Sequence, residues 1–109
     1  MHVRTIYIFG SYTDGTAGAK SDIDIGLRSD TEIPRKTIVE LSALLEIKLN
    51  IEVDLLDMMA ISTVMQMQIV SKGTRIYCED HFEAEASDDH VYLSYTRLNE
   101  ERAAVRLKA

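Results

Sequence analysis

The chain has 109 residues, the length of a single domain, which excludes a second full domain. Its 46% hydrophobic residues, five Gly and one Pro are typical of an ordinary globular protein and exclude wholesale disorder. A net charge of −6 disfavours direct nucleic-acid binding, and the single Cys78 excludes an internal disulfide, which indicates a cytoplasmic protein.

The first half of the chain contains two predicted strands and a helix. Residues 5–9 are β-branched and aromatic, and residues 22–27 alternate acidic with aliphatic side chains, so both are predicted to be strands. Residues 11–21, rich in Gly and small polar side chains, are expected to form a loop or a single helical turn. After Pro34, apolar residues recur at steps of three and four, which predicts an amphipathic helix that ends at Asn50.

The second half contains two further strands and two helices. Residues 51–56 and 74–78 are predicted strands, and the helix between them is expected to end at Gly73. The acidic residues 79–89 are interpreted as a solvated connection that could also steer a basic partner, and a C-terminal helix is predicted over about 88–108. This order predicts an α/β (α+β) fold, with a small mixed β-sheet of about four strands flanked by helices.

Asp22 and Asp24 are the first candidates for a functional site. They lie two residues apart on a predicted strand, so their carboxylates leave the same face while Ile23 and Ile25 point to the other. Two like charges so close repel unless a cation lies between them. Oxygen ligands suit Mg²⁺ or Mn²⁺, and Mg²⁺ is usually shared with substrate phosphates. The pair therefore points to a nucleotide.

Three further residues join this interpretation. Asp54 alternates with aliphatic neighbours on the next predicted strand, so it can reach the same metal centre and accept a proton. Gly10 and Ser11 follow the first strand at a sharp turn, where backbone and hydroxyl groups can bind phosphates. Asp57, by contrast, is expected to cap the following helix.

The spacing of these residues resembles a known signature. Gly10-Ser11, ten further residues and then Asp22-Ile23-Asp24 are similar to the Gly-Ser-x10-Asp-x-Asp signature of DNA-polymerase-β-like nucleotidyltransferases, with Asp54 in the place of the third acid. The segments IFGSYTDG, SDIDIGL and VDLLD resemble the minimal nucleotidyltransferases of prokaryotes from about Thr5 to Asp80. Residues 1–109 are accordingly expected to form one such domain, although members usually carry a helix ahead of the first strand.

The resemblance implies a function, a partner and a set of ligands. Members commonly serve as the antitoxin of a toxin–antitoxin pair and transfer AMP from ATP to a tyrosine of a HEPN-domain ribonuclease toxin. Asp22, Asp24 and Asp54 would be the catalytic and Mg²⁺-binding residues, while Gly10 and Ser11 would bind the nucleotide. Four basic side chains are equal candidates for contacting the triphosphate. These are Lys20, Arg28, Lys72 and Arg75.

Two alternatives stay open at this point. The chain could be a non-catalytic antitoxin that neutralises its partner by direct binding, or it could modify a small molecule or an RNA end. No apolar run approaches the ~20 residues needed to span a bilayer, so no membrane partner is expected.

Overall fold

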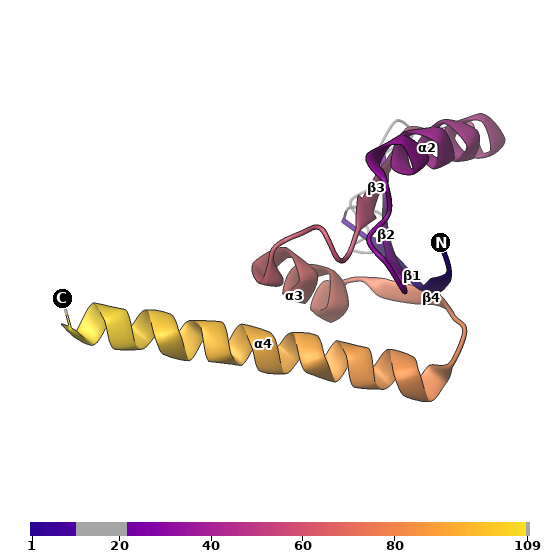
Figure 1. Cartoon of the computed structure of the whole chain (residues 1–109). Helices are drawn as coiled ribbons and strands as arrows, with labels where there is room; N and C mark the ends of the chain where they lie inside the picture. Colours follow the sequence, from indigo (N-terminus) through magenta and orange to yellow (C-terminus); the bar gives the residue numbers. More distant parts are fainter. Residues whose placement is uncertain (11–21, 109) are drawn as a thin grey trace.

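A four-stranded sheet forms the centre of the computed structural model, which describes residues 1–10 and 22–108 (Figure 1). The strands lie in the order β3-β2-β1-β4. β1 is antiparallel to both β2 and β4, whereas β2 and β3 are parallel, so the mixed sheet expected from the sequence is confirmed. The described elements are β1 (Val3–Phe9), β2 (Ile23–Ser29), α2 (Arg35–Leu49), β3 (Val53–Asp57), α3 (Thr63–Lys72), β4 (Thr74–Cys78) and α4 (His81–Lys108).

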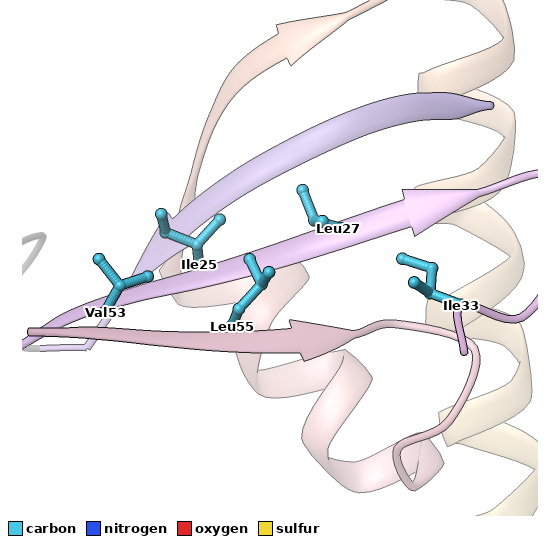
Figure 2. Close-up of a cluster of buried hydrophobic side chains, with 5 residues drawn as sticks. All are labelled: Ile25, Leu27, Ile33, Val53 and Leu55. Carbon is cyan, nitrogen blue, oxygen red and sulfur yellow. The ribbon is translucent and has the colours of Figure 1, made fainter. Parts of the chain in front are cut away.

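One face of the sheet forms an aliphatic core beneath α2. Alternate side chains of β2 and β3 point to this face, and Figure 2 shows them gathered on one side of the two strands. Helix α2 covers them with one apolar stripe, as the spacing of its residues predicts. The buried members are Ile25, Leu27, Ile33, Val53 and Leu55, and the residues packed on them from α2 are Ile38, Leu41 and Leu45.

The opposite face packs against α3 around Tyr7, Met58 and Ile69. Gly26 of β2 lies under this contact, and a Cβ atom added to it would stand 3.1 Å from the Met58 sulfur. The absence of a side chain at this position therefore lets α3 approach the sheet closely.

Helix α4 begins at His81, well ahead of the expected start near residue 88. The Asp80 side chain accepts a hydrogen bond from the Glu83 amide at 3.1 Å, which provides an N-terminal cap. The interpretation of residues 79–89 as a solvated connection is therefore wrong, because most of this acidic segment is the first part of the helix. The segment is helical because its carboxylates bind arginine side chains of the sheet, which are distant in the sequence.

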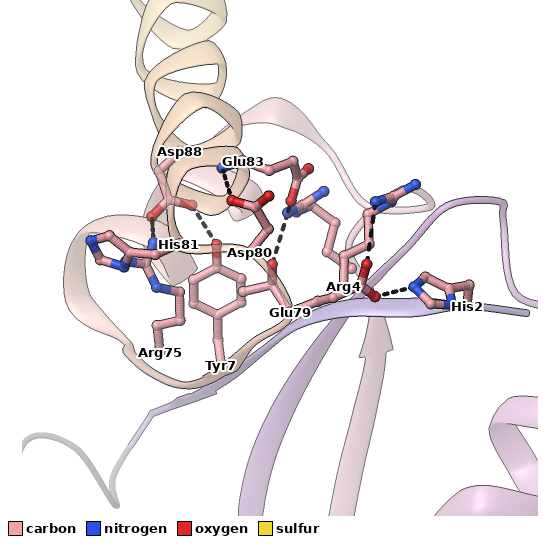
Figure 3. A network of polar contacts seen from close by, with 11 residues as sticks. His2, Arg4, Tyr7, Arg75, Glu79, Asp80, His81, Glu83 and Asp88 are labelled. Carbon is pink, nitrogen blue, oxygen red and sulfur yellow. Dashed lines mark hydrogen bonds and ion pairs between the residues drawn. The ribbon is translucent and has the colours of Figure 1, made fainter.

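A layer of polar side chains joins α4 to the sheet (Figure 3). Arg28 donates to Glu83 at 2.7 Å, and Arg75 donates to Glu85 at 2.6 Å and to Asp88 at 3.1 Å. Asp88 also accepts a hydrogen bond from the hydroxyl of Tyr7. Beyond this layer α4 continues past the sheet as a long projecting arm (Figure 1). No helix within the described ranges is long and apolar enough to cross a membrane.

Asp57 does not cap the following helix, contrary to expectation. It ends β3, is buried, and accepts hydrogen bonds from the Ile33 amide at 2.8 Å and the Met59 amide at 3.0 Å. A turn separates it from α3, whose cap is Ser62, with its hydroxyl accepting from the Met65 amide at 3.1 Å. Asp57 thus fastens the segment that leads into α2 to the end of β3.

We expect Tyr7→Phe to lower the free energy of unfolding by about 1 to 3 kcal/mol, because it leaves the partly buried Asp88 without one of its donors. Burial, followed by the hydrogen bond to Asp88, raises the pKa of the Tyr7 phenol, so the hydroxyl is the donor at neutral pH. Urea unfolding of the variant provides the measurement. Tyr77→Phe, at an exposed position on β4, is the matched control, and an equal loss in both variants would contradict the prediction.

Candidate active site

The paired register of β2 and β3 places two of the predicted acids side by side. Asp24 is the direct partner of Asp54 in the parallel ladder. The buried Ile25 and Val53 next to them point to the α2 core, so both carboxylates leave the opposite face. Asp54 is exposed and Asp24 is half-buried, which leaves this part of the sheet accessible to a substrate.

Gly10 closes the site from the side of β1. Phe9, the residue before it, pairs with Asp24, and Gly10 itself has a left-handed backbone with φ of 78°. A Cβ atom at this position would meet Oδ2 of Asp24, and the left-handed backbone also favours glycine here. Ser11, its predicted partner in phosphate binding, lies outside the described residues.

Asp22 is engaged by a fourth acid that the sequence analysis did not single out. The backbone amide of Ile23 donates to the carbonyl of Glu52 at 2.9 Å, which extends the contact of the two strands to their first residues. Glu52 lies next to Asp22, and its interaction with the Asp22 carboxyl group raises the pKa of Glu52. Glu52 and Asp54 alternate with the apolar Val53, and this alternation was the signal that could have identified Glu52.

The electrostatics of the site favour a bound cation. Burial raises the pKa of Asp24, and the charges of Asp54 and then Asp22 raise it further. A divalent ion would relieve this repulsion, and an all-oxygen donor set suits Mg²⁺. Within residues 1–10 and 22–108, no three acidic, His or Cys side chains already enclose a metal position. Mg²⁺ that is shared with substrate phosphates needs only one or two protein carboxylates.

The structure separates the four basic candidates. Arg28 and Arg75 are committed to the carboxylates of α4, and Lys20 lies outside the described residues. Lys72 is the last residue of α3. The following Gly73 packs against the Ile8 carbonyl and the Phe9 side chain, with 3.0 and 3.2 Å to an added Cβ, so Lys72 lies at the end of the sheet that carries the acids.

We expect Asp24→Asn to raise the midpoint of thermal unfolding at pH 7 in metal-free buffer. The folded-state pKa of Asp24 is raised, so its ionised form destabilises the fold, and the benefit of Asn should shrink as the pH falls towards the ordinary value of 3.8. Asp30, whose pKa is lowered chiefly by the His2 backbone amide, is a control of opposite sign, and Asp30→Asn should lower the midpoint at pH 7. A lower midpoint for Asp24→Asn would contradict this electrostatic description.

Comparisons with known proteins show which family the chain resembles. The family model described as Polymerase beta, Nucleotidyltransferase matches residues 1–82. The protein adenylyltransferase MntA of Shewanella oneidensis is 32% identical over 108 residues, which covers 94% of this chain and 73% of that protein.

Solved structures extend the similarity to the whole chain. A chain of a toxin–antitoxin crystallised with AMP-PNP has a TM-score of 0.87 and 30% identity, covering 99% of this chain and 86% of its own. A chain from the complex of a tri-AMPylated Shewanella oneidensis HEPN toxin with its MNT antitoxin has a TM-score of 0.78 and 28% identity, covering 97% and 82%. The signature, the fold and the family match lead to one conclusion: the chain belongs to the polymerase beta nucleotidyltransferase family.

Proposed function

We propose that this chain is the antitoxin of a toxin–antitoxin pair and transfers AMP from ATP to a tyrosine of a HEPN ribonuclease toxin in the cytoplasm. The observation that carries the proposal is the Asp24–Asp54 pair in register, with the backbone of Gly10 against the Asp24 carboxylate. The similarity to a protein adenylyltransferase, and to chains solved with an AMPylated toxin and with AMP-PNP, supports this substrate and this partner.

Asp22, Asp24 and Asp54 are the residues that would hold Mg²⁺, or Mn²⁺ in its place. When bound, the metal neutralises the charge of the triphosphate and of the departing pyrophosphate. The raised pKa of Asp24 supports this assignment, because burial and then the charges of Asp54 and Asp22 disfavour its ionised form in the metal-free protein.

The other residues position the substrates. Gly10 and Ser11 would bind the terminal phosphates through backbone amides and the Ser11 hydroxyl, and Lys72 is the described basic candidate at the end of the sheet that carries Asp24. Asp54, exposed at the edge strand, accepts the proton of the tyrosine hydroxyl. The phenolic oxygen then bonds to the α-phosphorus, and the bond from that phosphorus to the bridging oxygen breaks to release pyrophosphate.

The modification explains how the toxin would be silenced. AMP adds a bulky group and a negative phosphate to the tyrosine. If that tyrosine lies beside the ribonuclease site, the added group blocks RNA and repels its phosphate backbone.

We expect Mg²⁺ with a non-hydrolysable ATP analogue to raise the midpoint of thermal unfolding of the wild-type chain, because a ligand that binds only the folded state stabilises it. The double variant Asp22→Asn, Asp24→Asn should lose this shift. Differential scanning fluorimetry measures both, and Asp88→Asn, a change at an acid in the polar layer under α4, is the control that should keep the shift. A full shift in the double variant would disprove the metal assignment.

We expect Asp54→Ala to abolish transfer of label from α-phosphate-labelled ATP to the toxin while leaving binding of the toxin intact. The side chain is exposed and contributes little to packing, so binding and chemistry should separate. Intact-mass spectrometry of the co-expressed toxin provides the second measurement. It should show AMP additions when the toxin is co-expressed with the wild-type chain, and none when it is co-expressed with Asp54→Ala. If Asp54→Ala protects cells as fully as wild type, the chain acts by occlusion and the catalytic proposal is wrong.

A further inference from the structure

Strand β3, which carries Asp54, lies at the edge of the sheet and pairs with β2 on one side only. In its ladder with β2, the Glu52 carbonyl accepts from the Ile23 amide at 2.9 Å, so the amide of the next residue, Val53, points away from β2. That amide is not left to solvent. It donates at 3.0 Å to Oε1 of Glu46 in the last turn of α2.

We propose that Glu46 is a positioning residue that fixes the start of β3 and thereby sets Asp54 against Asp24. This inference rests on the proposed AMP transfer, because it assigns to Glu46 the placement of the proton acceptor in that reaction. It requires only the acceptor oxygen of Glu46, since its partner is a neutral backbone amide.

The turn between α2 and β3 is held by Glu46 at both ends. Asn50 ends the helix in a left-handed conformation with φ of 54°, and its amide donates to the Glu46 carbonyl at 2.8 Å. The side chain of Glu46 then accepts a hydrogen bond from the amide of Val53, three residues after Asn50. One residue of a packed helix therefore fixes the path of the chain into the site.

Asp54 depends on this restraint more than its neighbours do. The side chains of Val53 and Leu55 are buried in the α2 core, which fixes their orientation by packing. The Asp54 side chain is exposed and has no such packing, so its direction follows the backbone of the first residues of an edge strand. An active-site group must be held within about 0.5 Å of its working position, a tolerance that a frayed strand end does not meet.

The test compares three variants of the full chain: Glu46→Ala, which removes the acceptor, Glu46→Gln, which keeps it without the charge, and Glu40→Ala. Glu40 lies exposed on the same helix, 4.0 Å from Lys36, so it is the matched control. Amide hydrogen exchange at Val53 reports the hydrogen bond itself. The apparent affinity for Mn²⁺ in the presence of ATP and the kcat and KM for AMP transfer report the position of Asp54, all at temperatures well below each variant's unfolding.

We expect Glu46→Ala to speed exchange of the Val53 amide at least about tenfold, and to lower kcat roughly tenfold with little change in the KM for ATP, because misplacement of a reacting group by 1 Å can cost about a hundredfold in rate. Mn²⁺ affinity should fall with kcat. Glu46→Gln and Glu40→Ala should stay within about twofold of wild type in every measurement, because both variants keep the hydrogen bond between the side chain at position 46 and the Val53 amide.

Three results would overturn the proposal. One is unchanged exchange at Val53 in Glu46→Ala, and another is faster exchange with normal Mn²⁺ affinity and kcat. The third is an equal defect in Glu46→Gln, which would assign the effect to charge instead of to the hydrogen bond. If the wild-type chain transfers no AMP, the proposed function fails, while Val53 exchange and Mn²⁺ affinity still decide whether Glu46 orders this edge.

Discussion

The parallel register of β2 and β3 is the constraint on which the site depends. Asp24 faces Asp54 only because Ile25 faces Leu55 and Ile23 faces Val53 beside them. A slip of one residue would turn Asp54 into the aliphatic core under α2 and expose Val53 and Leu55, which the burial of these side chains opposes strongly. The hydrophobic effect on one face of the sheet thus holds two mutually repelling carboxylates together on the other.

Two groups of acidic side chains have opposite electrostatic surroundings. Glu83 and Glu85 of α4 meet Arg28 and Arg75, and the hydrogen bonds from these guanidinium groups lower the pKa of both carboxyl groups. At the start of β2 and β3, burial and then the neighbouring acids raise the pKa of Asp24, and the Asp22 carboxyl group raises that of Glu52. Net charge alone does not reveal this division, because it depends on which sheet residues lie beneath each acid. The second group is the one for which we propose a bound cation.

Much of the fold could be predicted from local patterns, and the exceptions have two causes. Strand alternation gives the sheet and its paired acids, and the spacing from Gly10 to Asp24 gives the turn beside them. The start of α4, the structural role of Asp57 and the contact of Glu46 with Val53 depend on partners distant in sequence or on turn geometry, which periodicity does not encode. Glu52 lies between these cases, since its alternation was visible but its partner Asp22 is thirty positions away.

The face of β2 that looks towards α3 and α4 shows how stability and function are divided along one strand. At its start, burial and then the like charges of Asp54 and Asp22 disfavour the ionised form of Asp24 in the folded state without a ligand. Gly26 admits α3, and Arg28 at the other end binds Thr5 and Glu83 at 2.8 and 2.7 Å. The charged groups at the Asp24 end, where chemistry is expected, therefore repel one another, whereas those at the Arg28 end, which anchors α4, attract one another. These side chains belong to a single strand. The well-packed end at Arg28 therefore supplies the rigidity that the end at Asp24, with its like charges, requires.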